Sequence, residues 1–439
     1  MTKLSTLYPA HIAELQTRAR NALHRENLEG IVIHSGQELK VFLDDTSYPF
    51  KVNPHFKHWL PLVDVPNSWL IITANAKPTL IYYQPVDFWH KVVELEESYW
   101  SEFFDIKLLS KAAEVDKILP YDKANYAYIG EHLEVAKALG FEQLNPEPLL
   151  NYLHFHRAYK TAYEQECMRL SNARAVKGHK AAKAAFLAGE TEYNIQQAYL
   201  AATEHVESET PYGNIVALNE NAAILHYTAL ERNAPQVHRS FLIDAGANFH
   251  GYASDITRTY AFKRDKFAEL IQRMDTLMLK AVDGLQPGKS YVDLHIATFA
   301  DIANVLKEFD FINVSPDVAI EAGIVGAFFP HGLGHHLGLQ THDVGGFMAD
   351  ERGTHINTPQ KHPFLRTSRI VETNQVFTIE PGLYFIDSLL ADVKGSKNSD
   401  MINWQNVDEM RPYGGIRIED NIIVHQSHNE NMTRDLLLD

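Results

Sequence analysis

Two aspartates flank a predicted hairpin in the segment SFLIDAGANFHGYASDITRTYAF, which covers residues 240–262. Runs of β-forming residues lie on both sides of Asn-Phe-His-Gly, and this pattern predicts two antiparallel strands joined by a turn. With a four-residue loop at 248–251, Asp244 and Asp255 face each other, and their Cβ atoms are expected roughly 4.5–5.5 Å apart. Like charges at that distance repel. The pair therefore predicts a cation between the carboxylates, with two solvated strand aspartates as the alternative.

A segment rich in histidine and glycine, FFPHGLGHHLGLQTHDVGG, spans residues 328–346. Four histidines punctuated by glycines indicate backbone held close to another group, with imidazoles converging on it. His335 and His336 are adjacent, so in extended backbone their side chains point to opposite faces. Only one of them is expected to be a ligand, and the spacing alone does not decide which.

Two further segments, FTIEPGLYF and GIRIEDNIIV, each place one glutamate inside an otherwise apolar strand, Glu380 and Glu419. A buried carboxylate without a partner is costly, so each of these is expected to have one. Arg417 precedes Glu419 by two residues and shares its strand face, so a surface Arg–Glu pair is the alternative for that glutamate.

Four carboxylates and one imidazole form an oxygen-rich set of ligands that contains no sulfur. Such a set suits two hard or borderline divalent ions better than a structural zinc ion. Two ions roughly 3.5–4 Å apart can share a hydroxide nucleophile and polarise a carbonyl or phosphoryl oxygen. These residues therefore predict a metal-dependent hydrolase.

The order of these residues resembles the pita-bread metallopeptidases, the family that includes methionine aminopeptidase, aminopeptidase P and prolidase. The shared features are two aspartates eleven residues apart, HGxGHxxGLxxHD, xxEPG and RxED, and they cover roughly residues 160–439. The preceding part, with LDD and YPFKVNPHFKHWLP, resembles the bacterial prolidases that are also called organophosphorus acid anhydrolases. The resemblance thus extends over the whole chain.

The resemblance implies two divalent metal ions per chain, with Mn²⁺ expected first and Co²⁺ or Zn²⁺ as alternatives. It favours His335 over His336 as the histidine ligand. Asp255 and Glu419 would bridge the two ions, Asp244 would complete one of them, and His335 and Glu380 would complete the other. The implied ligands are Asp244, Asp255, His335, Glu380 and Glu419.

The histidines His226, His331 and His342 match the family's non-ligand histidines, which steady the substrate and its tetrahedral intermediate. Glu380 is expected to have a second role besides ligation, because a carboxylate beside the metals can take the proton of the attacking water.

Recognition of a dipeptide requires groups for both of its charged ends. Arg417, assisted by His342, is expected to bind the proline carboxylate. Asp45, in the loop LDDTSYPF, is the candidate for the substrate ammonium, from its own or a neighbouring subunit, with a solvated loop aspartate as the alternative. Tyr212 is a further candidate for substrate binding.

The resemblance implies a Xaa-Pro dipeptidase with side activity on organophosphorus triesters and fluoridates, which resemble the tetrahedral intermediate. A Xaa-Pro aminopeptidase acting on longer peptides shares all five ligands and is the alternative. A non-catalytic binding protein or a creatinase-like, metal-independent hydrolase would have lost ligands, and this chain has lost none. The family is usually dimeric, so a homodimer or higher homo-oligomer is expected.

The elements that position these residues are predicted to form two domains, 1–160 and 161–439, giving an α+β chain overall. In the second domain Thr161 and Glu164 form a capping box that starts a helix ending near Gly189. Thr191 starts another helix. Further helices are predicted at 265–283 and 291–306, and β-rich segments around 213–225, 240–262, 375–386 and 414–425. The resemblance implies that these strands form a curved antiparallel sheet backed by the helices.

The first domain is predicted to be a small α/β domain. Residues 10–27 have apolar positions at helical spacing, and GIVIH, SWLIITA, PTLIYY and ANYAYIG are expected to be strands. The stretch at 44–61 is rich in aromatic residues and proline, and it is expected to be an ordered loop.

Composition excludes several other classes of protein. A net charge of −16 disfavours a nucleic-acid partner, and no segment approaches the 18 consecutive apolar residues of a membrane span. The N-terminal stretch has no apolar core of a signal peptide. Cys167 is the single cysteine, which excludes an intrachain disulfide and a thiolate metal site. A cytoplasmic protein is expected.

Overall fold

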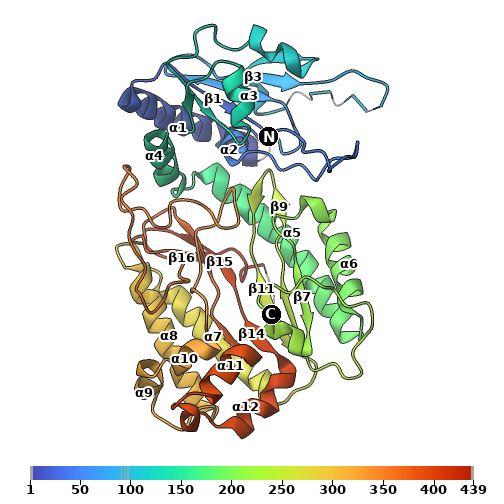
Figure 1. The fold of residues 1–439 in the computed structure, drawn as a ribbon, viewed down its shortest axis with the longest axis vertical. Helices are drawn as coiled ribbons and strands as arrows, with labels where there is room; N and C mark the ends of the chain where they lie inside the picture. Colours follow the sequence, from blue (N-terminus) through green and yellow to red (C-terminus); the bar gives the residue numbers. More distant parts are fainter. Residues whose placement is uncertain (1–2, 90, 93, 96–97, 437–439) are drawn as a thin grey trace. The chain divides into compact units, whose positions relative to one another are not determined.

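The computed structural model describes residues 3–89, 91–92, 94–95 and 98–436. The chain forms two compact units (Figure 1). Unit 1 takes in Met1–Cys167 with the short segments His250–Tyr252 and Asp350–Thr354, and unit 2 takes in the remaining segments. This division falls within helix α5 (Ala162–Leu187), whereas the sequence pattern places a boundary near residue 160. The boundary at 160 stays a prediction.

Unit 1 is built on a six-stranded mixed sheet with the strand order β4-β3-β2-β1-β5-β6. Strand β1 pairs antiparallel with β2 and parallel with β5, and the four strands expected from the sequence are β1, β2, β3 and β5. The α/β prediction for this part is therefore confirmed. The elements are α1 (Lys3–Glu26), β1 (Gly30–His34), α2 (Pro54–Trp59), β2 (Trp69–Thr73), β3 (Thr79–Tyr83), β4 (Asp105–Leu109), β5 (Tyr126–Ile129), α3 (Leu133–Ala138), β6 (Gln143–Leu144) and α4 (Glu147–Arg157).

Helix α2 corrects the expectation that residues 44–61 form a loop throughout. Asn53 is its N-cap and accepts a hydrogen bond from the His55 amide at 2.8 Å, and Pro54 follows as the first helical residue. An N-cap asparagine before a proline at the first helical position is a helix-start signal. The surrounding aromatic residues and prolines obscured this signal in the sequence.

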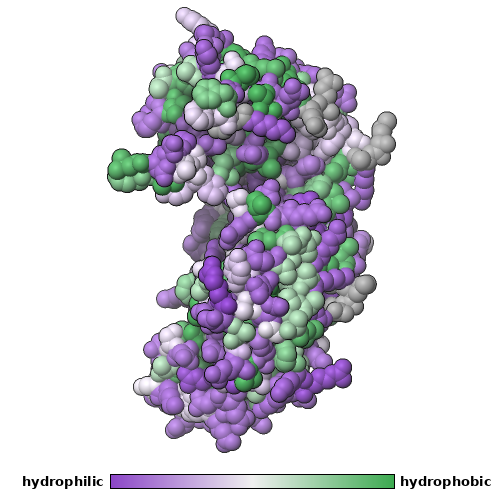
Figure 2. All heavy atoms as spheres, turned by 90° about the vertical axis from the view of Figure 1, so that its right-hand side faces the viewer, coloured by the Kyte–Doolittle hydropathy of each residue, from purple (hydrophilic) through white to green (hydrophobic). Residues whose placement is uncertain are grey.

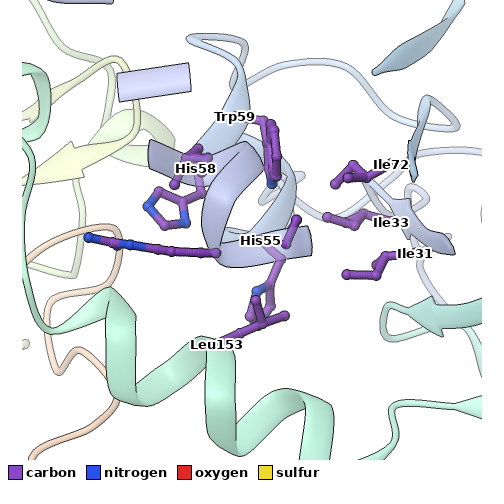
Figure 3. A pocket seen from close by; sticks show the side chains of 10 residues that line it. Ile31, Ile33, His55, His58, Trp59, Ile72 and Leu153 are labelled. Carbon is purple, nitrogen blue, oxygen red and sulfur yellow. The ribbon is translucent and has the colours of Figure 1, made fainter. Parts of the chain in front are cut away.

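A small cavity of about 30 Å³ lies inside unit 1, between α1, α2, α4, β1 and β2. Figure 3 shows Trp59 of α2 on one side of it and Ile31, Ile33 and Ile72 of the sheet on the other. This volume corresponds to roughly one water molecule, so a dipeptide does not fit. The cavity is a packing feature, and none of the residues that line it is a predicted site residue.

His34 at the end of β1 predicts a pH dependence of the stability of unit 1. Its side chain is fully buried and stacks on Trp69, with ring centroids 4.0 Å apart. Burial, followed by the charge of His132, lowers the pKa of His34 from 6.5 to about 3. The unfolded chain takes up this proton more readily than the folded one. The stability that neutral His34 confers is therefore complete above pH 6.5 and is lost as the pH falls from 6.5 to about 3.

We expect this histidine alone to cost about 1.4 kcal/mol of stability for each pH unit below 6.5. His34→Gln removes the titrating group, so unfolding monitored by tryptophan fluorescence should depend less steeply on pH between 6.5 and 5. The same steep dependence in His34→Gln and in the unchanged chain would assign the effect to other groups.

Unit 2 contains antiparallel strand pairs in the orders β11-β8-β7, β12-β15-β16, β13-β14 and β10-β9. Its strands are β7 (Ile215–Leu218), β8 (Ser240–Asp244), β9 (Asn248–Phe249), β10 (Tyr252–Ala253, its first residue in unit 1), β11 (Thr257–Ala261), β12 (Val376–Ile379), β13 (Gly382–Tyr384), β14 (Gly415–Arg417), β15 (Asp420–Val424) and β16 (Asn429–Asn431). Its other helices are α6 (Glu192–Thr203), α7 (Lys266–Gly284), α8 (Tyr291–Glu308), α9 (Pro316–Glu321), α10 (Ile324–Phe328), α11 (Asp387–Lys394) and α12 (Trp404–Met410).

Helices back these strands in two groups, which Figure 1 shows as the green and the yellow-to-red halves of unit 2. Side chains of α5 and α6, such as Phe186 and Ile195, share one core with Val216 of β7 and Phe241 of β8. Side chains of α7 and α8 share a larger core with β12, β13, β14 and β15. Because the helices pack on the faces of the strands, polar residues at the ends of several strands can approach one another.

The helix starts predicted from the sequence are confirmed at atomic detail. The Thr161 amide donates to Glu164 Oε2 at 2.9 Å, and the Glu164 amide donates back to Thr161 Oγ1 at 3.4 Å, which is the capping box of α5. Thr191 Oγ1 accepts from the Asn194 amide at the start of α6.

The face of the molecule in Figure 2 is mostly hydrophilic, with smaller hydrophobic patches between the polar side chains. Within the described part of the chain, none of the helices combines the length and the apolar character needed to cross a bilayer.

Candidate metal centre and active site

The hairpin that carries the two aspartates has a different register from the predicted one. Its turn consists of two residues, His250 and Gly251, both with positive φ angles of 51° and 86°. Asp244 therefore pairs with Thr257, and the Ala245 amide donates to the Ile256 carbonyl at 3.0 Å. The prediction that Asp244 and Asp255 lie directly opposite each other was wrong. Asp255 lies two residues before Thr257 and so remains on the same face as Asp244.

Asp255, His335 and Glu419 form a buried group whose candidate ligand atoms all lie within 4.8 Å of one another. Asp255 precedes β11, His335 lies in the glycine-rich segment, and Glu419 lies between β14 and β15. An isolated bridge between Thr257 and Glu419 places the junction of β14 and β15 beside β11. Three of the five implied ligands thus meet at one point.

Hydrogen bonds fix the backbone and side chain of Asp255. The Asp255 amide donates to Asn421 Oδ1 at 2.9 Å, and Asn421 Nδ2 donates to the Asp255 carbonyl. The Tyr212 hydroxyl lies 2.5 Å from Asp255 Oδ1 and 2.8 Å from Asp244 Oδ1. Tyr212 therefore contacts the two aspartates themselves, and its expected contact with substrate stays a prediction.

Asp244 lies at the end of β8 and is paired with Arg417. Arg417 Nη2 donates to Asp244 Oδ2 at 2.6 Å, Nη1 donates to the Tyr384 hydroxyl at 2.9 Å, and Nε donates to Thr257 Oγ1 at 3.2 Å. Arg417 is only 5% exposed, so it does not form the surface Arg–Glu pair that was the alternative, and its role toward substrate stays a prediction. Thr257 also donates to Glu419 Oε2 at 2.7 Å.

Glu380 follows β12 and faces His335 and His331. His335 Nε2 lies 3.8 Å from Glu380 Oε1 and 3.4 Å from Asp255 Oδ2. His335 Nδ1 lies 2.9 Å from the His336 carbonyl, which only accepts, so Nδ1 carries the proton and Nε2 faces the carboxylates. His336 points elsewhere and packs against Phe377 with ring centroids 4.6 Å apart.

A short hydrogen-bonded chain connects Arg417 to His331. The Tyr384 hydroxyl accepts from Arg417 and donates to His331 Nε2 at 2.8 Å, while His331 Nδ1 donates to the Gly332 carbonyl at 2.8 Å. His331 Nδ1 lies 4.0 Å from Glu380 Oε2. Burial, followed by the charge of Arg417, lowers the pKa of His331 to about 3, so this imidazole is neutral at physiological pH.

The remaining predicted residues lie in different surroundings. The His342 ring lies 4.4 Å from the His335 ring, and burial and His335 lower the pKa of His342 to about 4. His226 is exposed on a turn of unit 2, and its charge contributes to that shift. Asp45 is exposed in a loop of unit 1, where Lys40 Nζ donates to its backbone carbonyl at 2.6 Å.

Sequence reasoning missed three residues that shape this site, namely Tyr384, Asn421 and Thr257. Tyr384 lies four residues after Glu380 in the apolar segment FTIEPGLYF, where its hydroxyl gives no distinct signal. Asn421 and Thr257 have polar side chains inside the strand segments DNIIV and TRTYA. A buried polar residue within an apolar strand was the signal that identified Glu419, and it applies equally to Asn421.

The charges of the site favour a cation. Burial is the largest influence on Glu419, and with the neighbouring carboxylates it raises the pKa of Glu419 well above its usual range. Burial likewise raises the pKa of Asp244 and raises that of Glu380 to about 7. Burial also acts to raise the pKa of Asp255, but His335 and Tyr212 together outweigh it and lower this pKa. Buried carboxylates together with an imidazole nitrogen that faces them are the kind of donor set that divalent ions bind.

Comparison with known protein families identifies the class of this protein. The model of the Xaa-Pro dipeptidase N-terminal domain matches residues 6–155, and the model of metallopeptidase family M24 matches residues 166–426. The second match alone covers more than half of the chain, so the chain belongs to metallopeptidase family M24. Together with the buried Asp255, His335 and Glu419, this membership implies divalent metal ions at the site.

Relatives with curated names narrow the class further. The chain is 72% identical to the Xaa-Pro dipeptidase of Colwellia psychrerythraea over 99% of this chain and 98% of that protein. It is 60% identical to the Xaa-Pro dipeptidase of Pseudoalteromonas translucida over the full length of both.

Solved structures of aminopeptidase P share the fold at low sequence identity. The proline aminopeptidase P II from Yersinia pestis has a TM-score of 0.72 and 22% identity, covering 100% of this chain and 98% of that one. The zinc-substituted Escherichia coli aminopeptidase P in complex with product has a TM-score of 0.70 and 22% identity, covering 97% and 95%. The predicted fold class, an N-terminal α/β domain followed by a pita-bread domain, is confirmed.

Proposed function

We propose that this chain is a metal-dependent Xaa-Pro dipeptidase, which hydrolyses dipeptides with C-terminal proline. The observation that carries the proposal is the meeting of Asp255, His335 and Glu419 in a buried group, in a chain that resembles Xaa-Pro dipeptidases over its full length. Asp244 and Glu380 would complete the ligand set for two ions, with Asp255 and Glu419 between them.

Residues of the chain supply the remaining parts of the reaction. When bound, two divalent ions lower the pKa of water and polarise the scissile carbonyl. Glu380 Oε1 and Oε2 face His335 and His331, so this carboxylate can accept the proton of the attacking water and pass it toward the leaving proline nitrogen. His331 receives its hydrogen bond from Tyr384 at Nε2, and with His226 and His342 it would steady the substrate and its tetrahedral intermediate.

Several finer points belong to this proposal. Mn²⁺ is the metal we expect first, with Co²⁺ or Zn²⁺ as alternatives. Side activity on organophosphorus triesters and fluoridates is chemically reasonable, because these compounds resemble the tetrahedral intermediate. A cytoplasmic location and a homodimer or higher homo-oligomer stay predictions from the sequence.

Metal dependence gives a direct test of the activity. The protein is stripped with a chelator and reloaded with Mn²⁺, Co²⁺ or Zn²⁺, and hydrolysis of a Xaa-Pro dipeptide is followed after each addition. We expect the stripped protein to be inactive and Mn²⁺ to restore the highest activity. Full activity of the stripped protein would contradict the proposal.

Recognition of the two charged ends would explain a preference for dipeptides. The Arg417 guanidinium lies beside Asp244, and we expect it, assisted by His342, to bind the proline carboxylate. Asp45 is the candidate for the substrate ammonium. We expect Asp45→Ala to weaken dipeptide binding by roughly 1.5–3 kcal/mol, the range for a charge-assisted hydrogen bond.

The neighbouring Asp44 supplies a matched control for this prediction. Asp44→Ala removes a carboxylate of the same loop that accepts from the Thr46 amide, so a general disturbance of the loop should appear in both variants. An uncharged organophosphate has no ammonium, and its hydrolysis should respond differently to Asp45→Ala. Equal losses on both substrates would assign Asp45 a structural role.

A further inference from the structure

Glu192 is a buried carboxylate for which the proposed reaction has no use. It is the first residue of α6 and is only 1% exposed. Oε1 accepts from the Leu218 amide at 2.8 Å and from Asn221 Nδ2 at 2.9 Å, and Oε2 accepts from the Tyr227 hydroxyl at 2.7 Å and from the Glu231 amide at 2.8 Å. Four donors on one carboxylate saturate its acceptor sites, and the start of a helix favours its negative charge.

All four donors belong to one stretch of chain, residues 218–231. Leu218 ends β7 and Glu231 ends the stretch, so Glu192 ties its two ends to the start of α6. The Tyr193 amide also donates to the Glu231 carbonyl at 3.2 Å. The two side-chain donors, Asn221 and Tyr227, lie inside the stretch. It is therefore closed around a single carboxylate.

His226 lies inside this closed stretch, next to Tyr227. The His226 side chain is exposed, so the path of its backbone largely sets the position of its imidazole. Glu192 holds Asn221 and Tyr227 on either side of His226, and it therefore fixes the backbone from which this imidazole projects.

We propose that Glu192 is a positioning residue for catalysis, which holds His226 in place by closing residues 218–231 around its carboxylate. The inference rests on the proposed function, in which His226 steadies the substrate and its tetrahedral intermediate. Glu192 acts through His226 and touches no reacting atom.

Glu192→Gln tests this inference, because an amide nitrogen cannot accept and at least one of the four donors loses its partner. We expect kcat/KM for a Xaa-Pro dipeptide to fall roughly 10- to 100-fold, mainly in kcat, since small displacements of a positioned group cost rate steeply. His226→Ala should lose more, roughly 100- to 1000-fold, as for removal of a donor to an oxyanion. In the double variant Glu192→Gln should add less than about 3-fold, because residues that act together are not additive.

Thr191→Ala is the matched control, since it removes the N-cap of the same helix and leaves the contacts to residues 218–231 in place. Its melting temperature should fall while kcat/KM stays within about 2-fold of the unchanged chain. Should Glu192→Gln not fold, Tyr227→Phe removes a single donor and should also show a loss of kcat that disappears in the His226→Ala background.

If the losses caused by Glu192→Gln and His226→Ala multiplied in the double variant, the inference would be overturned. Unchanged kinetics of His226→Ala would also overturn it. Absence of Xaa-Pro cleavage by the unchanged, metal-loaded protein is a separate result. It would refute the proposed function itself.

Discussion

Asp255→Asn should leave the fold intact and remove most of the bound metal and nearly all activity. The backbone of Asp255 is held by Asn421, and an asparagine oxygen can still accept from the Tyr212 hydroxyl, so folding has little reason to fail. As the proposed ligand of both ions, this carboxylate would lose its charge against both when it becomes an amide. We expect kcat/KM to fall roughly 10³-fold or more, because several kcal/mol of charge stabilisation depend on the metals.

Elemental analysis of the purified variant provides the measurement, and Asp265→Asn provides the control. Asp265 is the N-cap of α7 and accepts from the Phe267 and Ala268 amides, a role that asparagine fills equally well. Asp265→Asn should retain two metals per chain and full turnover. If Asp255→Asn also retained two metals with normal turnover, the dinuclear site would have to be abandoned.

Glu380→Gln should depress turnover far more than substrate affinity. Glu380 faces His335 and His331, and a carboxylate beside the metals can take the proton of the attacking water. The amide cannot take the proton of the attacking water, and the loss of a general base costs roughly 10²–10⁴-fold in rate. KM should change little, because binding of the substrate ends depends on other residues.

Metal content must be measured beside the kinetics, since Glu380 is also an expected ligand. Glu321→Gln, an exposed residue at the end of α9, serves as a control for the substitution itself. A Glu380→Gln protein that keeps its metals and is altered mainly in KM would assign Glu380 a purely structural role.

Local signals in the sequence predicted the parts of the fold that depend on neighbouring residues. The capping box of Thr161 and Glu164 predicted the start of α5, and both of its hydrogen bonds are present. Helix α2 was missed although its Asn53–Pro54 start is equally local, because the aromatic and proline-rich surroundings favoured a loop.

The hairpin shows where local reasoning fails. The turn was placed over four residues, but His250 adopts a left-handed conformation beside Gly251, so two residues suffice. Histidine gives little warning of a positive φ, and a change of loop length shifts the register by two residues. Both aspartates stayed on one face because the shift was an even number.

The contacts that complete the site join residues far apart in the chain. Arg417 reaches Asp244 across 173 positions, and its link to His331 through Tyr384 depends on how β13 and β14 pair. Spacing could not choose between His335 and His336, whereas the structure turns His335 Nε2 toward Asp255 and packs His336 on Phe377. Such choices follow from the packing of distant strands, which no local pattern encodes.

Cleavage of dipeptides that end in proline is tested most directly by one assay with two substrates. The metal-loaded protein is given a Xaa-Pro dipeptide and, separately, the Xaa-Pro-Yaa tripeptide with the same first residue, and kcat/KM is measured for both. We expect efficient hydrolysis of the dipeptide and little hydrolysis of the tripeptide, whose proline carboxylate is blocked by a further residue. Equal or better hydrolysis of the tripeptide would contradict it and identify a Xaa-Pro aminopeptidase.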